Sequence, residues 1–351
     1  MEREMQYSAK QDIKSLNQKE LENLFMSFGE KSFRARQVYH WMHVKHATSF
    51  DEMSNISKSF KEKLEECCAL TVLRQKLVQR STLDETAKYL FELADGNMIE
   101  SVRMKYKHGN SVCISSQAGC RMGCRFCAST LGGLTRNLTP AEMLDQIYRI
   151  QEDIGERVSH VVVMGTGEPL DNYDHLLKFL ELLSDENGLN ISQRNITVST
   201  CGIVPNMRKL AKEKLQITLA ISLHASSQEK REELMPVARK YGIDELLKAC
   251  EEYFVQTGRR ITFEYSLVGG VNDQPQDARK LAGLIRGLNC HVNLIPVNPI
   301  KERAYVQPAG QAVMDFKQIL EKQGITVTVR REMGRDIDGA CGQLRRRQMN
   351  K

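Results

Sequence analysis

Residues 120–127 read Cys120-Arg121-Met122-Gly123-Cys124-Arg125-Phe126-Cys127, so three thiols lie within eight residues, directly after a predicted strand at 112–115. The C-x3-C-x2-C spacing offers a metal centre three ligands, whereas a structural zinc site is closed by four. Three cysteines around a four-iron cluster would leave one iron open to a substrate. A zinc site completed by Cys113 or by a distant histidine is the alternative, because thiol clusters also suit zinc.

Strand and helix patterns alternate downstream of this stretch. The expected strands cover 160–164, 195–200, 217–223, 261–267, 292–296 and 325–329, and the expected helices cover 139–154, 172–184, 205–214, 243–256, 275–287 and 309–323. Counting the strand at Cys113, six βα units predict an α/β protein with a partial (β/α)6 barrel, and an open doubly wound sheet is the alternative. Either architecture places the chemistry at the carboxyl ends of the strands.

The part of the chain before the cysteines has a different pattern. Apolar residues recur at helical spacing between residues 15 and 70, and Asp95-Gly96-Asn97 separates two apolar runs in the manner of a hairpin. We therefore predict a small N-terminal helical accessory domain over 1–75, a β-hairpin linker over 76–105 and a core over 106–331. Residues 332–351, which contain three glycines and a basic end, are predicted to form a C-terminal loop and tail.

The composition fits a globular protein of 351 residues with 41% hydrophobic residues and a net charge of +6. No apolar run approaches the roughly 18 residues of a membrane span, and residues 1–5 lack the apolar stretch of a secretion signal, so we expect a cytoplasmic protein. In a reducing compartment, ten cysteines indicate metal binding, redox chemistry or core packing.

Basic residues gather around the thiols. Between residues 101 and 136 there are six Lys or Arg and no Asp or Glu, and residues 330–351 hold seven basic against three acidic residues. A basic surface around a reactive site favours a phosphate backbone as partner, although an anionic small molecule would also suit it.

These stretches resemble the radical S-adenosylmethionine (radical SAM) superfamily, in the three-cysteine motif with Phe126 before its last thiol, in the partial barrel and in the segment 164–169, Met-Gly-Thr-Gly-Glu-Pro. The resemblance implies that Cys120, Cys124 and Cys127 hold a [4Fe-4S] cluster. It also implies that Gly167 and Glu168 receive the amino group of SAM. It further implies that polar or backbone groups at strand ends contact SAM: Ser199, Ser222, Leu223, His224 and Asn298. For any one of these residues alone, a loop hydrogen bond would be a sufficient explanation.

Cys113 and Cys341, with the residues around them, are similar to the adenine-C2 RNA methyltransferases within that superfamily. The departures are small, with Thr166 in place of a more usual Met and Gly339 in place of a more usual Ala. The resemblance implies methylation of one adenosine of 23S rRNA and of the adenosine beside the tRNA anticodon. The implied partners are 23S rRNA, tRNA and an electron donor such as flavodoxin or ferredoxin. The resemblance also implies a monomer that does not bind a membrane.

Adenine C2 is electron-poor and is not a nucleophile, so the implied mechanism is covalent catalysis through a thiol that carries the methyl group. Two SAM molecules are used per turnover, one to methylate Cys341 and one as the radical source. The resulting carbon radical adds to C2, Glu100 takes the C2 proton, and Cys113 attacks Cys341 to form a disulfide and release the base. Cys113 is the rival for that proton, and an exposed strand Glu is the alternative interpretation of Glu100.

Three other functions stay open at the level of sequence. A related enzyme methylates C8 of the same rRNA adenine and confers antibiotic resistance, and it shares both thiols. A radical SAM maturase would act on a protein or small molecule, and a zinc-stabilised RNA-binding module would have no catalysis.

Overall fold

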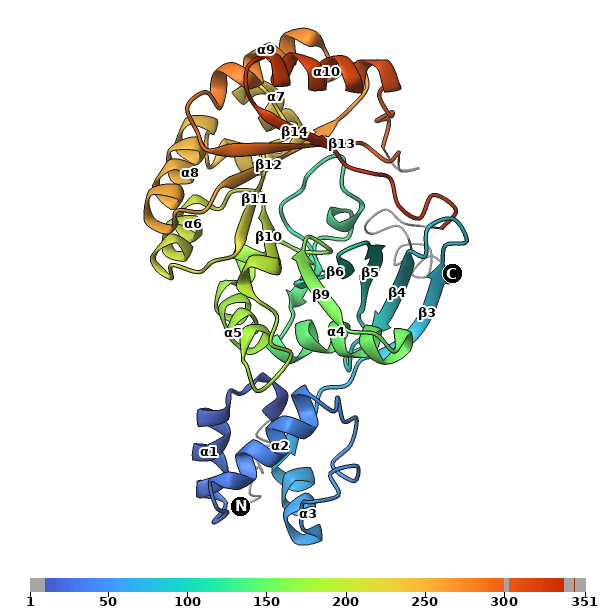
Figure 1. The fold of residues 1–351 in the computed structure, drawn as a ribbon, viewed down its shortest axis with the longest axis vertical. Coiled ribbons are helices and arrows are strands. Elements are labelled where there is room, and N and C mark those ends of the chain that lie inside the picture. Colours follow the sequence, from blue (N-terminus) through green and yellow to red (C-terminus); the bar gives the residue numbers. More distant parts are fainter. Residues whose placement is uncertain (1–9, 300–302, 338–343, 345–351) are drawn as a thin grey trace, which may run out of the picture.

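The structure, a computed structural model, describes residues 10–299, 303–337 and 344. Its centre is a ten-stranded sheet in the order β14-β13-β12-β11-β10-β9-β6-β5-β4-β3 (Figure 1). Seven neighbouring strands pair in parallel: β6 (Gly109–Ile114), β9 (Val158–Val163), β10 (Ile196–Thr200), β11 (Thr218–Ser222), β12 (Ile261–Leu267), β13 (Cys290–Pro296) and β14 (Thr326–Val329). Because the parallel strands follow one another in chain order without the reversal of a doubly wound sheet, and β14 and β3 remain as edges, the predicted α/β partial barrel is confirmed.

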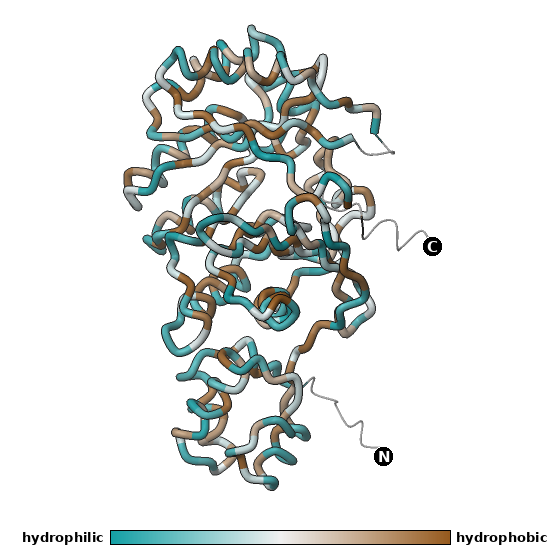
Figure 2. Tube along the Cα trace, turned by 45° about the vertical axis from the view of Figure 1, so that its right-hand side comes forward, coloured by the Kyte–Doolittle hydropathy of each residue, from teal (hydrophilic) through white to brown (hydrophobic). Residues whose placement is uncertain are grey.

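Helices connect the parallel strands and cover the outside of the curved sheet (Figure 1). The predicted helices are present as α4 (Pro140–Ile154), α5 (Tyr173–Ser184), α6 (Val204–Lys212), α8 (Ile243–Thr257), α9 (Pro275–Leu284) and α10 (Gly310–Lys322). Along the helices in Figure 2, hydrophobic and hydrophilic stretches alternate, as one buried face requires. The short helix α7 (Gln228–Leu234) was not predicted.

Helix α4 shows how local sequence sets an element's ends. Thr139 caps the amino end by accepting from the Glu142 amide, the Glu142 carboxylate accepts in return from the Thr139 amide, and Pro140 occupies the first helical position. Gly155 closes the other end with a left-handed φ of 62°. Its predicted range therefore agrees with the observed helix to within a residue.

Three antiparallel strands extend the sheet beyond β6. They are β3 (Arg74–Arg80), β4 (Ala87–Glu92) and β5 (Met98–Tyr106), and the predicted hairpin at residues 95–97 joins β4 to β5. The hairpin strands thus belong to the same sheet as the barrel strands.

The N-terminal helices α1 (Gln18–Ser27), α2 (Phe33–His43) and α3 (Lys58–Cys67) form a separate layer at the end of the molecule below α4 and α5 (Figure 1). This layer meets α4 through buried polar contacts. Lys14 pairs with Asp145 at 2.8 Å with both side chains fully buried, and the Nδ1 atom of His43 lies 2.6 Å from the Tyr148 hydroxyl. None of the described helices combines the length and apolarity needed to cross a bilayer.

The buried His43 predicts acid sensitivity of this contact. Burial, with a smaller effect from Lys14, lowers the pKa of His43 from 6.5 to about 3. The folded protein therefore keeps His43 neutral while the unfolded chain takes up a proton below pH 6.5, so stability is complete above pH 6.5 and falls as the pH drops towards 3. We expect a loss of about 2 kcal/mol at pH 5 from this residue.

Urea unfolding at pH 7.5 and pH 5 measures this effect. The His43→Gln variant should lose less stability between the two pH values than the parent, whereas His40→Gln, at an exposed position of the same helix, should behave as the parent. An equal pH dependence in the parent and His43→Gln would contradict the assignment.

Candidate active site

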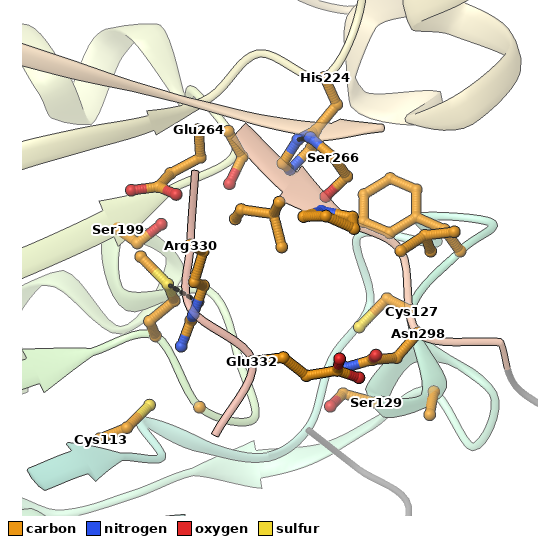
Figure 3. A pocket seen from close by; sticks show the side chains of 18 of the residues that line it. Cys113, Cys127, Ser129, Ser199, His224, Glu264, Ser266, Asn298, Arg330 and Glu332 are labelled. Carbon is orange, nitrogen blue, oxygen red and sulfur yellow. Dashed lines mark hydrogen bonds between the residues drawn. The ribbon is translucent and has the colours of Figure 1, made fainter. Parts of the chain in front are cut away.

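A cavity of about 1230 Å³ opens at the carboxyl ends of the parallel strands. Figure 3 shows polar side chains from separate strands and loops pointing into it. The predicted site residues that line it are Glu100, Cys113, Cys120, Cys124, Cys127, Gly167, Glu168, Ser199, Ser222, His224 and Asn298. Leu223 is fully buried beside the cavity, and Cys341 lies outside the described residues.

The three clustered cysteines lie on a loop between β7 (Gln117–Gly119) and β8 (Leu134–Asn137), which pair as a small antiparallel ribbon. Gly119 is required at the start of this loop, because its φ is 84° and a Cβ atom there would lie 2.1 Å from the Gly133 carbonyl oxygen. The Thr130 hydroxyl donates towards the carbonyl oxygens of Cys124 and Cys127 at 3.0 Å each. The loop backbone is therefore held in shape by its own residues.

The donor set of this loop fits an iron–sulfur cluster. Burial raises the pKa of all three thiols, and electrostatic repulsion from neighbouring thiols adds to the shift of Cys120 and Cys124. Metal binding offsets this cost, because the thiols release their protons and bind the metal as thiolates. Three soft sulfur donors on one cavity wall suit a [4Fe-4S] cluster. Among the described residues, no group of three or more His, Cys, Asp or Glu side chains is placed so that it could hold a single metal ion.

The segment after β9 faces the cysteine loop. Gly167 has a φ of 114°, and a Cβ atom there would lie 2.6 Å from the Cβ atom of Gln117. Glu168 is 3% exposed, and its carboxylate accepts from the Cys201 amide at 2.7 Å and from the Leu170 amide at 3.0 Å. Burial nevertheless raises the pKa of Glu168. A fixed carboxylate in the cavity wall offers its remaining lone pairs to an ammonium group.

His224 follows β11 and is held as a neutral ring. Its Nδ1 atom accepts from the Ser266 amide at 2.9 Å, which leaves the proton on Nε2. Burial lowers the pKa of His224 to about 3, and the backbone has a left-handed φ of 57°. The ring stands edge-on to Phe126 of the cysteine loop, with centroids 4.9 Å apart. His224 thus offers one N–H donor at fixed orientation beside the cysteines.

Glu264 is a charged cavity residue that the sequence did not predict, and Arg330 was counted there only as part of the basic C-terminal segment. Glu264 on β12 is 4% exposed and accepts from the Asn293 side chain at 2.8 Å, and burial raises its pKa. Arg330, just after β14, places a guanidinium nitrogen 3.5 Å from the Met164 sulfur (Figure 3). The sequence signal for Glu264 was its place as a charged residue inside the apolar run 261–267.

Glu100 forms a buried ion pair with Lys88, a residue that the sequence analysis did not single out. The Lys88 ammonium lies 3.0 Å from a Glu100 oxygen, with side chains 0% and 2% exposed. Lys88 on β4 is opposite Val102 on β5, which is opposite Cys113 on β6. Cross-strand partners share a sheet face, and Glu100, two residues before Val102, lies on that face as well. Lys88, Glu100 and Cys113 therefore all face the cavity side. The alternative of an exposed strand Glu at position 100 is wrong.

This ion pair predicts a large stability effect. Lys88→Met should cost about 3–5 kcal/mol, because it leaves the Glu100 carboxylate buried without its cation. The double variant Lys88→Met/Glu100→Leu should recover most of the loss. Urea unfolding measures both, with Lys105→Met as control, because loss of the more exposed Lys105–Glu156 pair should cost far less stability. Equal losses in the two lysine variants would contradict the burial argument.

The described segment before Cys341 is tied to the loop between β3 and β4. The Asp336 carboxylate accepts from the Ser81 hydroxyl at 2.6 Å, the Thr82 amide at 2.8 Å and the Thr82 hydroxyl at 3.0 Å. The Gly334 amide donates to Asp84 at 2.9 Å. We call these contacts the latch, and because Asp84 lines the cavity, the latch brings the C-terminal segment to the cavity rim.

The expected surplus of positive charge around the cysteines is partly wrong. Acidic residues distant in sequence neutralise several of the six basic residues: Lys105 pairs with Glu156, Arg121 with Asp171, and Arg136 with both Asp95 and Glu142. Arg103 is buried and donates to the Asn110 side chain. The local charge count therefore overstated how much free cationic surface surrounds the site.

Comparison with known proteins agrees with this geometry. The model of the ribosomal RNA large subunit methyltransferase N-terminal domain matches residues 11–70, and that of the radical SAM superfamily matches residues 114–282. A probable dual-specificity RNA methyltransferase RlmN of Lachnospira eligens is 64% identical over 338 residues, which is 96% of this chain and 97% of that protein. One from Lachnoclostridium phytofermentans is 59% identical over 335 residues, 95% of this chain and 94% of that protein.

Among solved structures, a radical SAM methyltransferase from Sphaerobacter thermophilus has a TM-score of 0.91 and 42% sequence identity, and the match covers 95% of this chain and 98% of that one. The similarity thus extends through the helical layer, the sheet and the cavity. The chain belongs to the RlmN family of dual-specificity RNA methyltransferases, within the radical SAM superfamily.

Proposed function

We propose that this radical SAM RNA methyltransferase methylates C2 of one adenosine in 23S rRNA and of the adenosine beside the anticodon in tRNA. The observation that supports this most directly is the position of Cys113. Its thiol lines the same cavity as Cys120, Cys124, Cys127 and Glu168, although the three-cysteine loop and β6 are separate elements. A second thiol opposite a cluster site is what a carrier mechanism requires.

Each group of cavity residues has a role in this proposal. Cys120, Cys124 and Cys127 hold the [4Fe-4S] cluster, which supplies the electron that cleaves SAM into a carbon radical. Gly167 and Glu168 hold the amino group of SAM. The remaining groups offer hydroxyl, imidazole, amide or backbone contacts to the rest of that molecule: Ser199, Ser222, Leu223, His224 and Asn298. Two SAM molecules are consumed per turnover, one of them to methylate Cys341.

Cys341 is the proposed methyl carrier and Cys113 the thiol that resolves the protein–RNA adduct. In the resolving step a bond forms between the sulfurs of Cys113 and Cys341. The bond between the Cys341 sulfur and the methylene carbon breaks, and that carbon takes up a proton to become the methyl group. Burial raises the pKa of Cys113, while Arg330 and Lys88 oppose the shift, so Cys113 rests as a thiol and must lose its proton before it attacks.

Glu100 is the proposed acceptor of the C2 proton. Lys88 holds its carboxylate as an ion pair facing the cavity, so the acceptor is present in the resting enzyme. A protonated Cys113 cannot accept a further proton, which favours Glu100 over its rival.

We further propose that residues 1–75 position the RNA, that 76–105 link them to the core at 106–331, and that 332–351 carry the catalytic thiol. The target adenine must leave its stack to reach the cavity, which favours a loop or bulge. The proposed partners are 23S rRNA and tRNA, with an electron donor such as flavodoxin or ferredoxin, for a monomer in the cytoplasm.

Nucleoside mass spectrometry of RNA from a deletion strain, before and after the gene is restored, tests the proposed product. Restoration should return 2-methyladenosine to both 23S rRNA and tRNA. A product methylated only at C8, or unchanged RNA, would overturn the proposed reaction, whereas a C2 product in only one RNA class would remove the dual specificity.

A further inference from the structure

Arg231 on α7 is a fully buried cation. Its guanidinium donates to the Cys201 carbonyl oxygen at 2.7 Å and to the Tyr241 carbonyl oxygen at 3.3 Å, and its Nε atom is buried without a partner. Of the ion pairs formed between described residues, none includes Arg231, so no carboxylate of this part of the chain balances its charge at salt-bridge distance.

An unbalanced buried charge is costly, and proteins retain one when a partner of opposite charge is supplied. Three thiols and the His224 ring are the ionisable groups that interact electrostatically with Arg231. Burial lowers the pKa of Arg231, and Cys201, Cys124 and Cys250 oppose that shift. Cys124 belongs to the three-cysteine loop, so the metal site is a source of negative charge within electrostatic reach of Arg231.

The packing places α7 directly against that loop. Cys124, Cys201, Leu234 and Met235 form one buried cluster, against which Phe126 and Cys127 pack. The Arg125 amide donates to the Leu234 carbonyl oxygen at 2.9 Å, which joins the cysteine loop to the end of α7. Arg231, one turn before that end, therefore stands behind the cysteines, on a wall of the site that is shielded from solvent.

We propose that Arg231 is the built-in counter-charge of the iron–sulfur cluster and sets its reduction potential; this inference rests on the proposed cluster ligands. Three thiolates around a core of charge +2 leave a net charge of −1, and accepting one electron makes it −2. A buried cation favours the more negative state, because a shielded charge is weakly screened. Net charge and surroundings are established determinants of such potentials.

A purely structural role for Arg231 makes a different prediction. Arg231 holds the Cys201 carbonyl, and the Cys201 amide holds Glu168, so the side chain could act only by positioning the SAM site. Arg231→Gln removes the charge and keeps a hydrogen-bond donor, whereas Arg231→Lys keeps the charge and alters the donor geometry. The two variants therefore separate the effect of charge from the effect of position.

The test is an anaerobic redox titration of the reconstituted protein with dithionite, followed by electron paramagnetic resonance of the reduced cluster. Arg231→Gln should retain its iron and sulfide but show a more negative midpoint potential, by at least tenfold in the one-electron equilibrium constant, or about 59 mV. Arg231→Lys should stay near the parent, as should Arg208→Gln, which removes an exposed cation from the neighbouring helix α6.

An unchanged potential in Arg231→Gln, or an equal shift in Arg231→Lys, would overturn the proposal. Arg231→Met, which fills the space with apolar atoms, gives the same readout if the glutamine variant does not retain its cluster. A parent protein without iron and sulfide would instead refute the proposed cluster, so the two failures are distinguishable.

Discussion

Replacing Cys113 with alanine should stop the reaction within its first turnover and leave RNA covalently attached to the protein. The carrier carbon can still add to adenine C2 in this variant, but no second thiol is present to attack the Cys341 sulfur. Denaturing gel electrophoresis with labelled RNA should show a band of protein plus RNA that is nearly absent with the parent. Product formation should fall from many turnovers to less than one per enzyme.

The matched control is Cys290→Ala, which removes a partly buried thiol on β13 that does not line the cavity. This variant should turn over normally and accumulate no adduct. Multiple turnovers by Cys113→Ala would refute the resolving role of that thiol.

Cys124→Ala should abolish both the cluster and all methylation. Cys124 is 9% exposed and central to the three-thiol loop, so its loss leaves two ligands for the cluster and a void in the packed wall. Protein purified without oxygen should be brown in the parent and colourless in the variant, with iron reduced to background levels. Iron and sulfide analysis measures the first effect, and nucleoside analysis of treated RNA measures the second.

Two comparisons sharpen this experiment. Cys341→Ala should keep the brown colour and the iron while losing methylation, because it removes the proposed carrier and not a proposed ligand. Cys67→Ala, in the N-terminal helix α3, should retain both properties. A colourless parent that contains zinc would favour a binding module over an enzyme.

Much of the fold was predictable because its signals are local. Strand β12 has the predicted bounds, and the capping residues of α4 mark its ends in the sequence. Helix α7 was missed because its sequence, QEKREEL, contains one apolar residue and therefore no helical hydrophobic period. Its importance comes from Arg231, whose burial depends on elements distant in the chain.

One reason explains why the sequence did not predict these further residues of the site. Lys88 and Glu264 look like ordinary polar residues of strands. Only the order and register of the sheet show that Glu264 lines the cavity and that Lys88 lies on the same sheet face as Glu100. The same limit explains the error in the charge count, since Arg136 is neutralised partly by Asp95, 41 residues earlier. Sequence motifs indicated the groups that are proposed to react, whereas the groups that balance their charges required tertiary structure.

The latch has a consequence for biosynthesis. Its two halves are 254 residues apart at Thr82 and Asp336, so the second half is synthesised long after the first. The sheet, the cysteine loop and the SAM cavity can all form from residues translated earlier. A chain that stops after residue 331 should therefore fold and take up iron, yet lack the proposed carrier thiol Cys341 and so fail to methylate its substrate. Such a fragment would compete with the parent enzyme for RNA.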